Sequence, residues 1–253
     1  MPLLSEHTTT TAADALAEAS VGLLPTGSTE QHGPALPLST DFTTAEALAR
    51  SLERDDVVVL PTVPVGVSEH HRQFDGTLSV RPETFEWYVE ETLSSLAAHG
   101  VRRAVVVNGH GGNSGALRRA ARSLRRDDVA FAAPWNWWEA VPDVLDEEFD
   151  ETGGHADAAE SSVMLHLAGE HVREDALADA EAGASDAWGR DVHGANVGFD
   201  TADFSESGAV GAPTQASPEA GERIVAAASD QLDALVDWLA GREYEALRPE
   251  PHR

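Results

Sequence analysis

The chain has 253 residues and carries 44 acidic against 17 basic side chains, which gives a formal net charge of -27. Such an acidic surface repels nucleic acid and anionic membranes, so neither is an expected partner. There is no cysteine, which excludes disulfides, a catalytic thiol and thiolate ligands, so any metal site must use histidine and carboxylates.

The acidic residues are spread along the whole chain, and every basic residue is an arginine. This pattern is typical of a halophilic protein in a salt-rich cytoplasm, because salt screens the repulsion between like charges. No apolar run is long enough to cross a membrane. The polar, threonine-rich residues 1–13 lack the pattern of a secretory signal, so we expect a cytoplasmic protein with a short disordered leader.

Short apolar runs alternate with longer helical patterns in the first half of the chain. One predicted helix has Pro82 in its first turn, and Gly100 follows its end. The predicted strands cover residues 21–25, 56–60, 76–80, 103–107 and 129–133, and the predicted helices cover 42–52, 82–99 and 117–126.

The second half of the chain is less regular. Residues 134–154 are acidic, rich in tryptophan and without clear periodicity. Residues 183–213 form a long segment rich in glycine and aspartate, and loops of that length are usually functional or mobile. Helices are predicted over residues 156–167 and over a final stretch to about residue 240, which Ser217 can cap.

The alternation of strands and helices predicts one α/β domain with a mainly parallel sheet. We place this domain at residues 16–245, after a leader of residues 1–15 and before a tail of residues 246–253.

Glu30, His32 and Asp41 lie on the loop of residues 27–41, which follows the first predicted strand. Carboxylate and imidazole groups that converge from a loop shaped by glycine and proline suit a divalent cation such as Zn, Mn or Fe. Taken singly, Asp41 fits a helix cap, His32 a loop histidine and Glu30 a solvated charge. We favour a metal site because the three occur together.

His110 lies within Asn108-Gly-His-Gly-Gly-Asn113, directly after the most apolar predicted strand. Ligands of a parallel sheet bind beyond the carboxyl ends of its strands, and glycine lets the backbone approach them closely. Asn108 and Gly109 are therefore candidates for substrate binding. A structural turn is the alternative; a phosphate site is a weaker one, because the lysine and the spacing of a P-loop are missing.

His155 and Glu160 lie across a predicted loop-to-helix junction. Glu160 shares its helix face with Ala156 and Val163, where a carboxylate is unusual unless it is paired or bound to a metal. His155 suits a proton shuttle, and Glu160 is a candidate for both catalysis and metal binding. The alternative is that Glu160 is an ordinary acid near a helix N-terminus.

Two further segments carry candidate substrate-binding residues. Residues 66–79 are polar and contain two adjacent histidines, and Ser68 is our candidate there. Trp135 and Trp138 follow a predicted strand and could wall a pocket for a planar substrate; core packing or a subunit contact is the alternative.

Six motifs, in order over about residues 20–240, resemble the creatininase (creatinine amidohydrolase) family. Their number and order are specific to the family, though not to one substrate. The motifs are Gly27-Ser-Thr-Glu-Gln-His-Gly33, Leu36-Pro-Leu-Ser-Thr-Asp41, Phe74-Asp-Gly-Thr-Leu-Ser79, Asn108-Gly-His-Gly-Gly-Asn113, His155-Ala-Asp-Ala-Ala-Glu-Ser-Ser-Val-Met-Leu165 and Gly208-Ala-Val-Gly-Ala-Pro213.

The resemblance implies a three-layer α/β/α sandwich with a mainly parallel central sheet, and a homohexamer. It also implies two divalent metal ions per subunit, with Asp41 as the bridge, Glu30 and His110 on one ion and His32 on the other. A hydroxide between the ions would attack the carbonyl of a small-molecule amide substrate. His155 would carry the proton to the leaving nitrogen.

The chain departs from creatininase proper at two places. Gly111 and Gly112 stand where creatininase has an aromatic residue and a glutamate, and Glu160 is our candidate for the missing ligand. Residues 149–154 contain no counterpart of the tryptophan that covers the creatininase substrate. Other branches of the family keep the Gly-Gly form, among them an archaeal deformylase of flavin and deazaflavin biosynthesis and the peptidase that trims the mycofactocin precursor peptide.

Creatinine, a formamidopyrimidine nucleotide and a peptide therefore remain candidate substrates. A nucleotide would require an arginine near the pocket, and Arg72 is the nearest in sequence. A non-catalytic metal-binding or assembly protein is the alternative from a different class. The presence of both His155 and Glu160 argues against it.

Overall fold

A parallel four-stranded sheet forms the centre of the molecule in the computed structural model, which describes residue 1, residues 3–150 and residues 154–250. The strand order is β2-β1-β3-β4, and each neighbouring pair is parallel, as predicted. Leu23 pairs with both Val59 and Val105. The strands are β1 (Val21–Thr26), β2 (Val57–Val59), β3 (Arg103–Asn108) and β4 (Phe131–Asn136).

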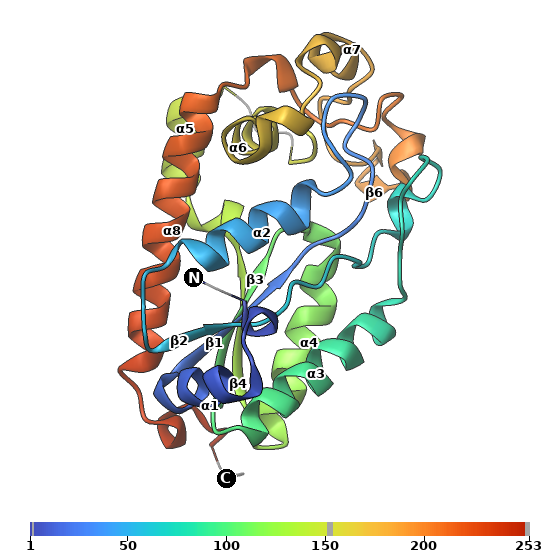
Figure 1. Ribbon diagram of the computed structural model, residues 1–253. Coiled ribbons are helices and arrows are strands. Elements are labelled where there is room, and N and C mark those ends of the chain that lie inside the picture. The colour runs from blue at the N-terminus through green and yellow to red at the C-terminus, as the bar shows by residue number, and fades with distance from the viewer. Residues whose placement is uncertain (2, 151–153, 251–253) are drawn as a thin grey trace.

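Helices cover both faces of this sheet, which confirms the predicted three-layer sandwich (Figure 1). Successive strand residues point to opposite faces, so Val105 and Val107 pack in one core cluster and Val106 in the other. One layer contains α2 (Thr40–Ser51), α6 (Ala158–Ala168) and α8 (Pro218–Ala240), and the other contains α3 (Pro82–Ala98) and α4 (Ser114–Arg126).

The helix boundaries follow the local chemistry of the sequence. Pro82 begins α3, and Gly100 follows its end with a φ of 97°, a conformation that favours glycine. Ser217 caps α8 by accepting a hydrogen bond from the backbone N–H of Ala220, as predicted.

Three predictions about local structure were wrong. The leader expected to be disordered contains α1 (Thr9–Glu18), which Thr8 caps through the backbone N–H of Thr11. The strand predicted over residues 76–80 is absent, because Leu78 makes only an isolated bridge to Thr29. The irregular stretch of residues 134–154 includes the end of β4 and α5 (Pro142–Glu148), while its residues 151–153 lie outside the described part.

The long segment expected over residues 183–213 is irregular apart from one small hairpin, formed by β5 (Asp191–Val192) and β6 (Ala195–Asn196). A short helix that we did not predict, α7 (Leu177–Ala182), precedes it. Of the predicted tail, residues 251–253 lie outside the described part.

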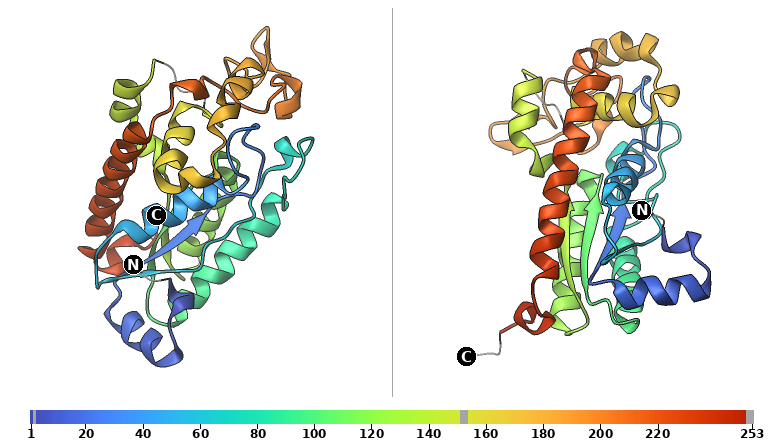
Figure 2. Two further views of the ribbon diagram at one scale, coloured as in Figure 1. Left: turned by 45° about the horizontal axis from the view of Figure 1, so that its top comes forward. Right: turned by 60° about the vertical axis from the view of Figure 1, so that its left-hand side comes forward.

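The two ends of the sheet differ in what lies beyond them. Helices α6 and α7 lie beyond the carboxyl ends of β1 and β3, whereas α1 lies at the opposite end (Figure 2). Within the described residues, no helix is long and apolar enough to cross a membrane.

Candidate metal centre

Six candidate side chains meet at the carboxyl end of the sheet. The loop after β1 carries Glu30 and His32, and the first turn of α2 carries Asp41. His110 follows β3, while His155 and Glu160 precede and begin α6. All are buried except Glu160, which is partly exposed to solvent.

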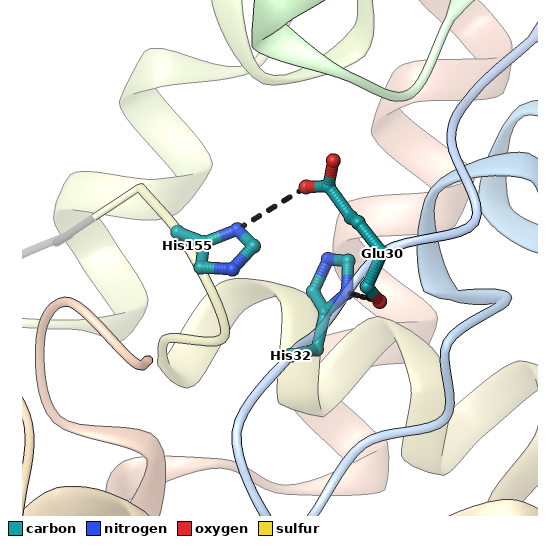
Figure 3. Close-up of side chains that lie close together, drawn as sticks. All are labelled: Glu30, His32 and His155. Atoms are coloured by element: carbon teal, nitrogen blue, oxygen red, sulfur yellow. Dashed lines mark hydrogen bonds and ion pairs between the residues drawn. The ribbon is translucent and has the colours of Figure 1, made fainter. Parts of the chain in front are cut away.

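Asp41 divides these side chains into two sets of potential ligands. Its Oδ2 lies 3.3 Å from Nδ1 of His110, and the same nitrogen lies 3.2 Å from Oε1 of Glu30. Its Oδ1 lies 3.0 Å from Nε2 of His32, which lies 3.6 Å from Oε2 of Glu160. In each set the three ligand atoms lie within 4.8 Å of one another. One carboxylate thus serves two three-residue clusters, and a third possible ligand group joins Glu30, His32 and His155 (Figure 3).

Hydrogen bonds orient both histidines toward the centre of these clusters. The ring N–H at Nδ1 of His32 faces the carbonyl oxygen of Glu30 at 3.1 Å, which leaves Nε2 as the electron-pair donor (Figure 3). His110 has the opposite arrangement: Nε2 lies 2.9 Å from the carbonyl oxygen of Val67, so Nδ1 is the free donor. Contacts of this kind fix the ring orientation of histidine ligands.

The unsatisfied atoms of the site fit a cation. Oε1 of Glu30, Oδ2 of Asp41 and Nε2 of His32 are buried and make no hydrogen bond within the described part of the chain. Buried polar atoms normally have a hydrogen-bond partner. Burying several carboxylates without a compensating positive charge costs folding free energy. Oxygen and imidazole donors in this number suit Zn, Mn or Fe.

Burial and neighbouring charges move the pKa values of the site apart. Burial alone lowers the pKa of His32, but the carboxylates of Asp41 and Glu160 outweigh it and raise this pKa to about 10. Burial raises the pKa of Glu160 to about 8 against the attraction of His32. Burial, helped by the charge of His32, lowers the pKa of His155 well below its usual range. Without metal, His32 therefore holds a proton at neutral pH and His155 does not.

Two glycines allow this geometry. A Cβ atom at Gly109 would lie 2.1 Å from the carbonyl oxygen of Asp41, so only glycine allows the strand end to approach α2. A Cβ atom at Gly112 would lie 2.4 Å from Nε2 of His110. Position 112 therefore has no room for a glutamate side chain. Glu160 instead lies beside His32 and Asp41, where it can serve as the third ligand of that cluster.

His155 is held by Gln31, whose side chain also contacts His71. Nε2 of His155 lies 2.9 Å from the backbone carbonyl oxygen of Gln31 and 2.8 Å from its side-chain amide nitrogen. We assign the ring proton to Nε2, because the carbonyl oxygen can only accept a hydrogen bond. The two amide hydrogens of Gln31 then bond the carbonyl oxygen of Gly208 at 3.0 Å and Nδ1 of His71 at 2.8 Å. With this assignment, unprotonated Nδ1 of His155 faces Glu30, 3.7 Å from Oε1.

A cavity of about 720 Å³ opens onto the two clusters. Among the described residues its wall contains no arginine, and the chain has no lysine. Arg72 instead pairs with Asp200 at 2.8 Å and Glu69 at 3.2 Å. Gly109 and Trp138 line the cavity, as do Trp137, Trp188, Phe199 and Phe204.

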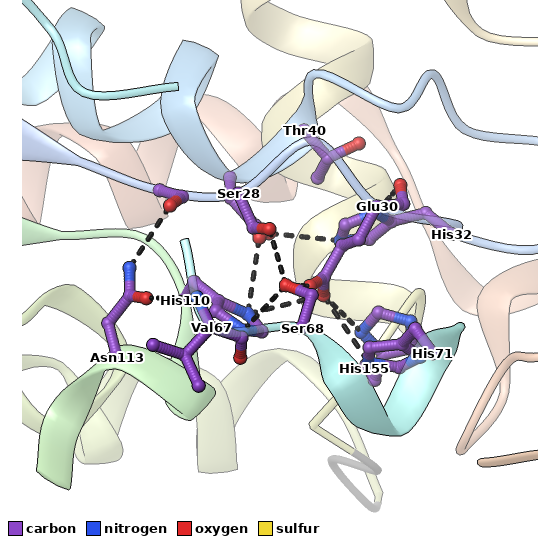
Figure 4. Close-up of polar contacts among 12 residues, drawn as sticks. Ser28, Glu30, His32, Thr40, Val67, Ser68, His71, His110, Asn113 and His155 are labelled. Atoms are coloured by element: carbon purple, nitrogen blue, oxygen red, sulfur yellow. Dashed lines mark hydrogen bonds and ion pairs between the residues drawn. The ribbon is translucent and has the colours of Figure 1, made fainter. Parts of the chain in front are cut away.

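The other three candidate substrate-binding residues lie outside the cavity wall. Ser68 is buried and donates a hydrogen bond to Oε2 of Glu30, so it supports that carboxylate from behind (Figure 4). Asn108 is buried and donates to the carbonyl oxygen of His110 at 2.6 Å. Trp135 packs partly buried against the core.

Sequence reasoning missed three residues at this site. Gln31 lies inside a quoted motif, but its contacts with His71 and His155 depend on side-chain geometry. Trp188 lies in the aperiodic segment before the hairpin, and a tryptophan within a glycine-rich loop was the one available signal. Thr201 places its hydroxyl 3.0 Å from Nδ1 of His71.

Comparisons with known proteins point to one family. The creatininase family model, described as creatinine amidohydrolase, matches residues 5–236. The mycofactocin precursor peptide peptidase of Mycobacterium tuberculosis (strain H37Rv) is 34% identical over 229 residues, or 86% of this chain and 85% of that protein.

Solved structures show the same fold. A crystal structure of creatinine amidohydrolase superposes with a TM-score of 0.79 at 25% identity, covering 95% of this chain and 98% of that one. A mutant creatininase described as a Zn-Zn type superposes with a TM-score of 0.77 at 25% identity, covering 94% and 98% of the two chains.

Proposed function

The chain belongs to the creatininase family and is a hydrolase that acts on C–N amide bonds, and we propose that it does so with two divalent metal ions per subunit. The observation that carries this proposal is the position of Asp41. Its two carboxylate oxygens face different histidines, 3.0 Å from His32 and 3.3 Å from His110. A carboxylate placed in this way suits a bridge between two ions.

Glu30 and His110 would hold one ion, and His32 and Glu160 the other. The three orphaned buried atoms on Glu30, Asp41 and His32 support this distribution. The likeness to a creatininase of Zn-Zn type supports zinc as one of the metals to test. When bound, two such ions would lower the pKa of a coordinated water and polarise the amide carbonyl.

The remaining chemistry belongs to side chains of this chain. Nδ1 of His155 can accept a proton, because Nε2 is committed to the carbonyl oxygen of Gln31. The lowered pKa of His155 keeps the ring uncharged at neutral pH. We infer that His155 takes the proton of the attacking water and passes it to the leaving nitrogen.

Within the candidate substrates, we favour a peptide amide. A cavity of about 720 Å³ is large for a single small ring and lies within the range of pockets that hold larger ligands. The missing arginine on its wall disfavours a nucleotide phosphate, and Arg72 is already paired. The 34% sequence identity to the mycofactocin precursor peptide peptidase also favours a peptide substrate.

A turnover test compares creatinine, a formamidopyrimidine nucleotide and a C-terminal fragment of the mycofactocin precursor peptide side by side. The protein is held in molar KCl and loaded with Mn or Zn. We expect hydrolysis of the peptide only, abolished by chelation and strongly reduced by His155→Ala. Turnover of the nucleotide would contradict the substrate assignment, and metal binding without turnover of any amide would favour the non-catalytic alternative.

We also expect the homohexamer that the family resemblance implies. Large apolar side chains exposed on the single chain support an assembly. Among them, Trp87 and Tyr88 lie next to each other on α3. Light scattering coupled to gel filtration measures the mass directly, and a monomer would contradict the expectation.

A further inference from the structure

Trp188 lies directly over the histidines of the site. Its indole ring meets the ring of His155 nearly edge-on, with centroids 6.0 Å apart and an interplanar angle of 77°. It meets His71 at 6.1 Å and His70 at 5.8 Å in the same manner. Phe204 packs against it at 5.6 Å. One side of the tryptophan therefore touches the imidazole proposed to carry the proton.

The rest of this ring is open. Trp188 lines the cavity and remains 49% exposed, and its neighbour on the wall, Phe199, is 79% exposed. Leaving this much aromatic surface in water loses the gain that burial would give, about 25 cal/mol for each Å². An aromatic side chain that is fixed on one face and open on the other is suited to hold a ligand.

The chain around Trp188 is ordered by specific turns. Gly189 has a φ of 79°, and a Cβ atom there would lie 2.7 Å from Nδ2 of Asn196. The hairpin turns through His193 and Gly194, both at positive φ, as a two-residue turn of this hand requires. Oδ1 of Asn196 accepts hydrogen bonds from the backbone N–H groups of Arg190 at 3.2 Å and Gly198 at 2.9 Å.

Residues 200 and 201, which follow the hairpin, also contact residues next to the site. Asp200 accepts hydrogen bonds from Arg72 at 2.8 Å and Gln73 at 2.5 Å, next to the two adjacent histidines. Thr201 contacts His71. The ring of Trp188 is thus positioned before any ligand arrives, which lowers the entropy cost of binding.

We propose that Trp188 is the substrate-contacting residue that packs on the group next to the scissile amide and selects an aromatic or apolar group there. The proposal rests on the proposed function, because the amide must lie at the metal centre for its neighbour to reach the indole. The charge of the wall agrees with it. Asp146 is acidic and no described wall residue is an arginine, so an anionic group is disfavoured.

The test uses the metal-loaded protein and two hydroxamates that bind divalent ions in the same way. Benzohydroxamate carries a phenyl ring and acetohydroxamate a methyl group. Calorimetry in molar KCl measures both dissociation constants, and quenching of tryptophan fluorescence gives an independent readout. The variants are Trp188→Ala and Trp188→Phe, with Trp238→Ala as the matched control, a tryptophan on α8 that is 44% exposed and outside the cavity wall.

We expect Trp188→Ala to weaken benzohydroxamate about tenfold and acetohydroxamate less than twofold, with the metal content unchanged. A tenfold loss corresponds to about 1.4 kcal/mol. Trp188→Phe should lose about threefold, and it decides the matter if the alanine variant folds poorly. Trp238→Ala should change neither constant, and only the Trp188 variants should lose the ligand-induced quenching.

The proposal is overturned if the wild-type protein does not prefer benzohydroxamate, or if Trp188→Ala weakens both hydroxamates equally or loses metal. Failure of the proposed function has a different signature. In that case the wild-type protein hydrolyses no amide, while the preference for benzohydroxamate and its dependence on Trp188 persist.

Discussion

The backbone carbonyl oxygen of Gln31 lies 2.9 Å from Nε2 of His155, and the two residues are 124 positions apart in the chain. This contact determines which ring nitrogen of His155 faces the carboxylates. It depends on a second pairing, in which the backbone N–H of Val210 donates to the carbonyl oxygen of His155 at 2.8 Å. The segments after β1, before α6 and before α8 therefore jointly position one imidazole.

Replacing His155 tests its role in proton transfer. His155 belongs to neither of the two ligand groups that contain Asp41, only to the third group with Glu30 and His32, so His155→Ala should retain both metals. We expect kcat to fall by about 10²- to 10⁴-fold, the usual contribution of general acid–base catalysis, with KM changed little. Steady-state kinetics and elemental analysis on the same sample check this, and a variant with less than a tenfold loss in kcat would refute the role.

Replacing Asp41 tests the bridge. Asp41→Asn keeps the shape but removes the charge that the two clusters share, so we expect it to lower the metal content to one ion per chain or less. Asp146→Asn is the matched control, since Asp146 lines the cavity but belongs to neither cluster. Mass spectrometry of the metals after dialysis gives the count. Two ions retained by Asp41→Asn would argue against a bridge, provided that circular dichroism shows a folded protein.

The outline of the fold could be predicted from the sequence because its core is strongly patterned. Val105, Val106 and Val107 form a β-branched run that is typical of a strand covered on both faces, and the structure has that strand. The strand expected around Leu78 has the right alternation but lacks a neighbouring strand, which no local pattern reveals. Helix α1 was missed because its threonines have weak helix propensity.

The candidate site, too, could be predicted from the sequence only in part. The side chains on the quoted motifs converge because the carboxyl ends of parallel strands meet at one edge. The contact of Trp188 with His155 is different, since it crosses a segment without periodicity and depends on turns at Gly189 and Gly194. Ser68 was expected on the cavity wall but lies behind Glu30, because side-chain direction in a loop is not encoded by residue type.

Removing the metals should reverse how stability depends on pH. In the metal-free protein the pKa of His32 is raised to about 10, so its proton stabilises the fold fully below the unfolded pKa near 6.5, and this contribution is lost as the pH rises toward 10. The raised pKa of Glu160, about 8, acts in the same direction above its unfolded value near 4.5. The Tm of the chelated protein should therefore fall between pH 7 and 9.

The metal-loaded protein should behave in the opposite way over that range. A metal replaces the proton on His32, so its affinity rises with pH and stabilises the fold further. Calorimetric scans at pH 7, 8 and 9 with and without chelator compare the two states. His32→Gln is the control and should reduce the pH slope of the chelated protein to the part that Glu160 contributes. Equal slopes in both states would contradict the proposed protonation of His32.

The charge of -27 makes stability depend on salt. The Debye length is about 3 Å at 1 M salt and about 30 Å at 0.01 M. The repulsion among surface carboxylates is therefore screened at high salt and becomes stronger when the salt concentration is lowered. We expect the Tm to fall by more than 10 °C between 2 M and 0.05 M KCl, with loss of the folded state near the lower limit. Circular dichroism melts across the series measure this. A Tm that does not change with KCl would remove the case for adaptation to salt.

Arg54 gathers three carboxylates and ties the end of α2 to α8. It bonds Asp56 through two nitrogens at 2.8 and 2.9 Å, and its Nη1 lies 2.9 Å from Asp233 and 2.5 Å from Asp237. Hydrogen bonds from Arg54 hold the pKa of Asp56 below its usual value. This contribution to stability is present above the unfolded pKa near 3.8 and is lost as the pH falls through the folded value.

We therefore expect Arg54→Ala to lower the free energy of unfolding by about 1 kcal/mol at pH 7, since partly exposed ion pairs contribute little singly and more as a network. The loss should shrink at pH 3, where Asp56 begins to take up its proton. Arg126→Ala is the matched control, because Arg126 is exposed and pairs only with its neighbour Asp127 among the described carboxylates, and it should destabilise the protein less than Arg54→Ala does. Urea titrations at both pH values, in the same KCl, give the four differences. If the two variants are equally destabilised at pH 7, the link between α2 and α8 is not what Arg54 contributes.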